Sequence, residues 1–66
     1  MEILVNGQPR TAGDGLTVAH LVAELGLTGK RLAVEVNRDI VPRGEHATHV
    51  LQGGDRIEII HAIGGG

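Results

Sequence analysis

Eleven glycines punctuate this chain and leave segments that are each long enough for only one short strand or helix. A chain of 66 residues buries only about 60% of the surface that it exposes when unfolded, so its core has room for one sheet and one helix. We therefore expect a single small domain over residues 1–66, assembled from short elements that are separated by tight turns.

The N-terminal segment predicts a β-hairpin. Apolar residues alternate with other residues in MEILVN and so fall on one face of a strand. Asn6 and Gly7 follow, and this dipeptide favours a type I′ turn because both central residues of that turn need a positive φ. The chain then returns over residues 8–12, where Pro9 lacks a backbone donor, which predicts a strand at the edge of a sheet.

The segment GLTVAHLVAELGL predicts an amphipathic helix over residues 17–25. Thr17 is expected to cap its N-terminus, and Gly26 to take the left-handed position after its last turn, with Leu27 folding back on Val22. The apolar face of this helix consists of Val18, Leu21, Val22 and Leu25.

The second half of the chain predicts further strands. An alternating segment at 32–36 leads through a turn at 37–39 into the short segment IVP at 40–42. The segment THVLQGGD is expected to form a brief strand and a glycine turn before a last strand, RIEIIHAI. This last strand points Ile57 and Ile59 into the core and Glu58, Ile60 and Ala62 to the opposite face.

Taken in order, these elements predict an α+β fold with a mixed sheet and one main helix packed across it. The first and last strands are the most apolar, so we expect them side by side and parallel in the middle of the sheet. This arrangement is similar to the β-grasp fold of ubiquitin-like proteins. A central strand would then lead directly into the three glycines at 64–66.

Composition excludes several classes of function. Phe, Tyr and Trp are absent and the formal net charge is −2, so neither stacking platforms nor a basic stripe favours nucleic acid as a partner. No segment approaches the roughly 18 apolar residues of a membrane span, and the start lacks a signal-peptide pattern, so we expect a cytoplasmic protein with no membrane partner. The absence of cysteine excludes a disulfide, a nucleophilic thiol and a side-chain persulfide.

Histidine is the only residue type that raises the question of a metal site. No set of carboxylates or thiols accompanies the histidines at ligand spacing, so we expect neither a metal nor a bound cofactor. The four histidines are His20, His46, His49 and His61.

The final glycines predict a flexible tail over residues 63–66. Glycine allows a close approach of the backbone to a ligand, so Gly64 and Gly65 could carry the α-carboxylate of Gly66 into a channel too narrow for other residues. A carboxylate is a poor electrophile and needs activation, most simply by adenylation with ATP. The chain contains no phosphate-binding loop of the G-x-x-x-x-G-K-[ST] type, so we expect a separate enzyme to carry out this step.

Along nearly its whole length the chain resembles the ThiS family of bacterial sulfur carriers in thiamine biosynthesis. The matching segments are ILVNG, LTVAHLVAELGL, AVEVNRDIVPR, LQGGDRIEII and the final GGG. The resemblance is most specific in VNRDIVPR, in GDRIEI and in the terminal glycines. One departure is His46, where many members carry Trp, and it affects a packing contact.

The resemblance implies a protein co-substrate and not an enzyme. A ThiF-like adenylating enzyme would use ATP and Mg²⁺ to convert the Gly66 carboxylate to an acyl adenylate. Sulfur from a persulfide on a cysteine desulfurase or relay protein would replace AMP and leave a thiocarboxylate. This group would donate sulfur to thiazole synthase, ThiG, which builds the thiazole from a deoxyxylulose phosphate sugar and a glycine-derived imine.

Docking of these enzymes needs a surface as well as a tail. Leu4 and Ile60 are expected on the sheet face opposite the core, beside Ala62 and Ile63, where they would form a small apolar patch for partner binding. Isolated surface aliphatic residues are also common without any function.

Three other functions remain open. The first is a sulfur carrier of the same fold, either the small subunit of molybdopterin synthase or a carrier for tRNA thiolation. The second is a non-covalent ubiquitin-like binding module, and the third is a modifier that is conjugated to lysine.

Overall fold

The computed structural model describes residues 1–61. Its strands are β1 (Glu2–Val5), β2 (Gln8–Thr11), β3 (Leu32–Val36), β4 (Asp39–Val41) and β5 (Arg56–His61). Its helices are α1 (Val18–Glu24) and a short 3₁₀ helix (Arg43–Glu45).

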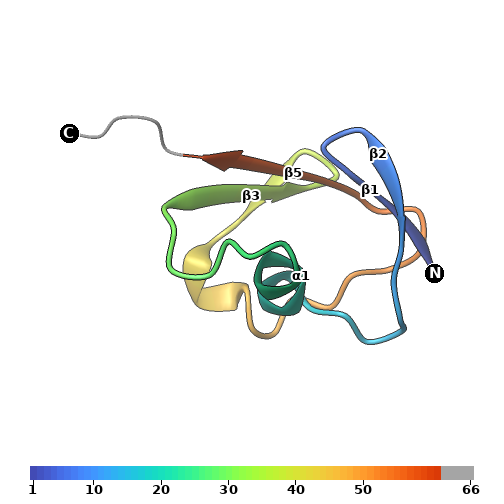
Figure 1. The fold of residues 1–66 in the computed structure, drawn as a ribbon, viewed down its shortest axis with the longest axis horizontal. Coiled ribbons are helices and arrows are strands. Elements are labelled where there is room, and N and C mark those ends of the chain that lie inside the picture. The colour runs from blue at the N-terminus through green and yellow to red at the C-terminus, as the bar shows by residue number, and fades with distance from the viewer. Residues whose placement is uncertain (62–66) are drawn as a thin grey trace.

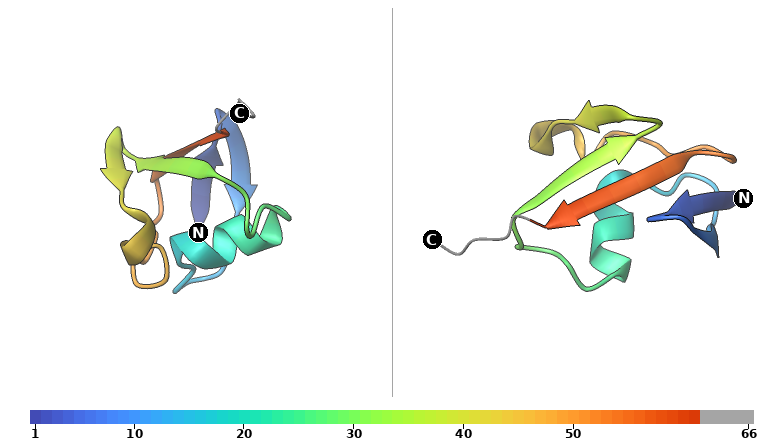
Figure 2. Two further views of the ribbon diagram at one scale, coloured as in Figure 1. Left: turned by 90° about the vertical axis from the view of Figure 1, so that its left-hand side faces the viewer. Right: turned by 90° about the horizontal axis from the view of Figure 1, so that it is seen from above.

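The five strands form one mixed sheet in the order β2-β1-β5-β3-β4. The first and last strands, β1 and β5, pair in parallel in its centre, and every other neighbouring pair is antiparallel (Figure 2). The proline-bearing β2 lies at one edge. The predicted α+β, β-grasp arrangement is therefore confirmed.

Helix α1 packs on one face of the sheet, and the 3₁₀ helix lies on the same side (Figure 1). The core fills the space between these layers, and the inward residues of β3 and β5, Val34 and Ile57, are fully buried. Burying a side chain of this size contributes about 1.5–3 kcal/mol, so a small set of aliphatic residues supplies most of the stability. The core contains Ile3, Leu16, Val18, Leu21, Val22, Val34, Val36, Val41, Leu51, Ile57 and Ile59.

Both hairpins turn through two residues with positive φ. Asn6 and Gly7 have φ of 50° and 81°, as expected for a type I′ turn. The turn between β3 and β4 uses Asn37 and Arg38, with φ of 52° and 72°. The predicted turn at 37–39 is confirmed, but a positive φ at Arg38 is unusual because only glycine takes this conformation without steric cost.

The helix ends are capped as the sequence predicts. The Thr17 side chain accepts the backbone N–H of His20 at 3.1 Å. At the other end Gly26 has a φ of 74°. The N–H groups of Gly26 and Leu27 donate to the carbonyls of Ala23 and Val22, both at 3.0 Å, which is the Schellman pattern.

The predicted strand in THVLQGGD is wrong. Only an isolated bridge between Val50 and Thr17 forms there. The segment packs in the core and against the residues before α1 instead of joining the sheet. Leu51 is buried, and its N–H donates to the carbonyl of Leu16 at 2.8 Å. The two adjacent apolar residues of this segment, Val50 and Leu51, therefore contact the segment before α1 and do not form a sixth strand.

Element boundaries differ by one or two residues. Thr17 and Leu25 are caps outside α1, and the short segment expected at 40–42 forms β4 one residue earlier. The last strand was predicted to run through Ile63, but Ala62 and Ile63 lie outside the described residues. Within residues 1–61 no helix is long and apolar enough to cross a membrane.

Candidate functional site: strand β5 and the open sheet face

Strand β5 is held along both edges. On one side it forms five antiparallel pairs with β3, from Val36 opposite Ile57 to Leu32 opposite His61. On the other side it pairs in parallel with β1, where Val5 lies beside Ile57. This strand is therefore an interior strand of the sheet, and the chain continues from its end toward residues 62–66.

Asn6 extends the ladder on the β1 side beyond the end of β1. Its backbone N–H donates to the carbonyl of Ile57 at 2.9 Å, and its side-chain oxygen accepts the N–H of Ile59 at 2.8 Å. The residue that makes the hairpin turn thus also supplies an acceptor to the central strand. The sequence indicates the turn at Asn6, but it gives no signal for this second role.

Asn37 likewise forms hydrogen bonds to the backbone of β5, at the first residue of the strand. Its side-chain oxygen accepts the N–H of Arg56 at 3.0 Å, and its backbone N–H donates to the carbonyl of Arg56 at 2.8 Å. Its side-chain amide also donates to the carboxylate of Asp55 at 3.0 Å. The asparagines of the two hairpin turns therefore hold β5 from opposite sides.

The sheet face opposite α1 is open in the described part of the chain (Figure 1). Ile60, on β5, lies on this face and is 50% exposed. Ala33 is its register partner on β3 and is also exposed. An apolar strip consisting of Ala33 and Ile60 therefore lies near the end of β5.

Leu4 lies on the same face as Ile60, as predicted, but not beside it. The register partner of Leu4 is Arg56, and Ile60 is four residues farther along β5, which is roughly 13 Å at about 3.3 Å per residue. Glu58 lies between them on this face, opposite Glu35 of β3. The role of Leu4 and Ile60 in partner binding stays a prediction.

The remaining predicted site residues cannot be placed. Ala62 and Ile63 of the apolar patch and Gly64, Gly65 and Gly66 of the tail lie outside the described residues.

Two of the four histidines that suggested a metal site support the start of α1 through their backbone carbonyls. The carbonyls of His46 and His49 accept the N–H groups of Ala19 and Val18 at 2.8 and 3.0 Å. These two N–H groups belong to the first turn of α1, which has no partners for them within the helix. The other two histidines, His20 and His61, are exposed. Among residues 1–61 no three His, Asp or Glu side chains gather in a way that could hold a metal ion.

The side chain of His46 is tied to β4. Its Nε2 lies 2.9 Å from the carbonyl oxygen of Val41. Because a carbonyl oxygen only accepts hydrogen bonds, Nε2 is the protonated nitrogen. The histidine at this departure from the family pattern is therefore hydrogen-bonded to β4.

The strand order and the single covering helix define a ubiquitin-like protein of the β-grasp class. The sequence matches the model of the ThiS family over residues 3–66. The chain belongs to the ThiS family, so the predicted family is confirmed.

Individual relatives and solved structures agree with this assignment. The chain is 38% identical to the sulfur carrier protein ThiS of Escherichia coli over 66 residues, with full coverage of both proteins. A crystal structure of a thiamine biosynthesis protein (ThiS) from Geobacter metallireducens superposes with a TM-score of 0.85 at 29% identity, again covering 100% of both chains.

Two further relatives are longer. The chain is 44% identical to a thiazole synthase of Magnetococcus marinus and 39% identical to one of Paramagnetospirillum magneticum, over 66 residues in each case. The whole chain aligns with these proteins, but it covers only 20% of the length of each.

Proposed function

We propose that this chain is a sulfur carrier of thiamine biosynthesis, a protein co-substrate that supplies sulfur for the thiazole ring. The observation that carries the proposal is the similarity to ThiS over the full length of both proteins. The strand order supports it, because the central strand β5 gives the glycines at 64–66 a firmly held base from which to extend.

The proposed reactive group is the α-carboxylate of Gly66. A ThiF-like enzyme would join this carboxylate to AMP, with ATP and Mg²⁺ as its own reactants, and release pyrophosphate. The outer sulfur of a persulfide on a cysteine desulfurase or relay protein would then displace AMP from the acyl carbon and form an acyl disulfide with the donor. A thiol reductant would supply two electrons to break the S–S bond, which releases the donor thiol and leaves the thiocarboxylate on Gly66. The sequence contains no cysteine, so the acyl group of Gly66 is the position in these residues best suited to hold sulfur.

Thiazole synthase is the proposed recipient of the sulfur. Support comes from the relatives that are named thiazole synthase and contain a segment similar to this whole chain. The ThiF-like enzyme and the persulfide donor rest on the chemistry alone. We place the carrier in the cytoplasm as part of the same proposal, because its activation requires ATP.

The proposed docking surface is the open sheet face around Ile60, continuing to Leu4 and to Ala62 and Ile63. Exposed aliphatic side chains next to the end of β5 would contact an enzyme that holds the residues after this strand.

Reconstitution with purified partners tests the function. Thiazole synthase, its sugar phosphate and imine substrates, the adenylating enzyme, ATP, Mg²⁺, a persulfide donor and a thiol reductant are combined with this chain, and thiazole product is measured. The proposal predicts one molecule of thiazole product for each carrier molecule that gives up its sulfur, and no product without the carrier. Product at an equal rate without the carrier would reject the proposal.

A further inference from the structure

A cavity lies between α1, the loop that precedes β3 and the 3₁₀ helix. It has a volume of about 290 Å³, near the lower end of the range for small-molecule sites. Leu32 lines it at the start of β3 and is the register partner of His61, so the cavity lies beneath the end of β5. Its apolar floor is formed by Ala19, Val22, Leu27 and Leu32.

The charged side chains of this cavity are basic, and Thr28 adds a neutral polar group. Lys30, Arg43 and His46 line it, and none of its lining residues is acidic. This bias contrasts with the whole chain, where eight Asp and Glu residues outnumber six Lys and Arg residues. The arrangement therefore favours a negative charge at this position, although the net charge of the protein disfavours one.

Neither Lys30 nor Arg43 has a carboxylate partner among the described residues. Within residues 1–61 the only ion pair joins Arg10 and Glu24, at 3.1 Å. The contacts of the cavity residues are to backbone carbonyls: Arg43 donates to Lys30 at 3.4 Å, and His46 bonds Val41. Each contact uses one donor, and a guanidinium has five, so donors remain for a ligand.

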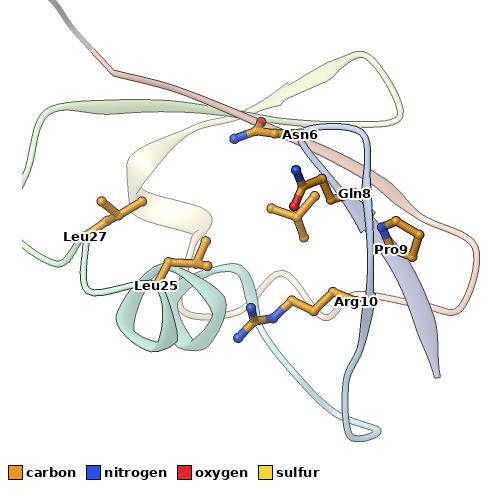
Figure 3. Close-up of a pocket in the computed structure, with 7 residues that line it drawn as sticks. Asn6, Gln8, Pro9, Arg10, Leu25 and Leu27 are labelled. Atoms are coloured by element: carbon orange, nitrogen blue, oxygen red, sulfur yellow. The ribbon is translucent and has the colours of Figure 1, made fainter.

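A second cavity also contains a basic side chain, but that side chain is paired with a carboxylate. It lies between the first hairpin and the end of α1, with Leu25 and Leu27 on the helical side, and Figure 3 shows the Arg10 side chain extending toward α1. Here the cation already has a partner, because Glu24 on α1 pairs with Arg10. The cavity at Lys30 therefore differs in carrying basic groups that no carboxylate of the described residues balances.

We propose that the cavity lined by Lys30, Arg43 and His46 binds a small organic anion that carries a short apolar stem. The stem lies on the aliphatic floor, and the anionic group lies at the basic rim. This site is independent of the proposed sulfur carriage, so either proposal can fail without affecting the other.

The experiment uses the full chain labelled with ¹⁵N and compares three probes of equal length: hexanoate, hexylammonium and 1-hexanol. We expect hexanoate to shift the backbone amides of Lys30, Leu32 and His46. We expect its dissociation constant to be at least tenfold lower than that of hexylammonium, with 1-hexanol between them. Equal affinity for the two ions, or shifts centred on another part of the protein, would overturn the proposal.

Two charge-reversal variants separate local from long-range effects. Lys30→Glu and Arg38→Glu change the net charge equally, and both residues are exposed, but Arg38 lies in the turn between β3 and β4. We expect Lys30→Glu to weaken hexanoate binding at least fivefold and Arg38→Glu to change it less than twofold. An equal loss in both variants would show a general charge effect and contradict a local site.

A third variant tests the cavity itself. His46→Trp keeps a ring N–H donor, and we expect its larger ring to occupy part of the cavity. The folded variant should lose hexanoate binding, and unchanged binding would contradict the proposal. If His46→Trp does not fold, the comparison of Lys30→Glu with Arg38→Glu decides the question.

Discussion

The side-chain oxygen of Asn6 accepts the backbone N–H of Ile59 at 2.8 Å and so joins two positions that are 53 residues apart in the chain. This bond continues the parallel ladder between β1 and β5 after β1 has ended at Val5. It ties the strand that precedes the glycine tail to the first turn of the protein.

Replacing Asn6 should destabilise the fold through the loss of this acceptor. Asn6→Gly keeps the positive φ but leaves the partly buried N–H of Ile59 without a partner, so we expect the free energy of unfolding to fall by about 1–3 kcal/mol. Urea unfolding followed by far-UV circular dichroism measures this value, since the chain contains no Trp or Tyr. Asn6→Asp keeps an acceptor oxygen and serves as the matched control, with a smaller expected loss. Faster hydrogen exchange at Ile59 in Asn6→Gly but not in Asn6→Asp would identify the bond responsible.

The second hairpin should gain stability from a single change. Arg38 has a φ of 72°, a conformation that costs an ordinary residue roughly 1–2 kcal/mol and glycine very little. Part of this gain is offset because glycine is freer in the unfolded chain, so we expect Arg38→Gly to raise the free energy of unfolding by about 0.5–1 kcal/mol. Arg10→Gly, a like change on β2, is the control and should lower it. A loss of stability in Arg38→Gly would contradict the claim that the positive φ at Arg38 is strained.

The sequence predicts those parts of the fold that depend on neighbouring residues. Asn6 with Gly7 indicates a turn, and Thr17 with Gly26 marks the ends of the helix, because these residues act through their own backbone angles or on groups within one helical turn. Apolar alternation likewise identifies Ile57 and Ile59 as inward residues of the last strand.

Features that join distant segments leave no such local pattern. The first N–H groups of α1 are satisfied by the backbone carbonyls of His46 and His49, and a backbone acceptor has no side-chain signature. The segment around Val50 resembles a strand because Leu51 must be buried, although it packs at the helix instead of joining the sheet. For the candidate site, the sequence identified the shared face of Leu4, Glu58 and Ile60, but not the register that places Leu4 beside Arg56 and so leaves Glu58 between Leu4 and Ile60.

The two faces of β5 should differ in how much the free energy of unfolding falls when one methylene group is removed from a side chain. Ile57 is fully buried, so Ile57→Val should lower the free energy of unfolding by about 0.5–1.5 kcal/mol. Ile60 is 50% exposed, and Ile60→Val on the same strand should change this value by less than about 0.5 kcal/mol. Urea unfolding of both variants gives the comparison, and equal losses would mean that the outer face is covered by other residues.

The open sheet face should contribute to binding of the adenylating enzyme. Ile60→Asp places a charge on the proposed surface, and we expect at least a tenfold rise in the dissociation constant measured by calorimetry. Val50→Asp is the matched control, because Val50 is 51% exposed against 50% for Ile60 but lies beside the start of α1. If both variants bind as tightly as the parent chain, the surface has been assigned to the wrong face.

The central claim is that Gly66 carries the sulfur, and intact-mass spectrometry tests it most directly. The chain is incubated with its adenylating enzyme, ATP, Mg²⁺, a persulfide donor and a thiol reductant that cleaves the acyl disulfide to the thiocarboxylate, and a variant that lacks Gly66 is treated in parallel. We predict a mass gain equal to one sulfur replacing one oxygen in the parent chain and no gain in the variant, which should remain folded. No gain in the parent chain, or the same gain in the variant without Gly66, would contradict the account.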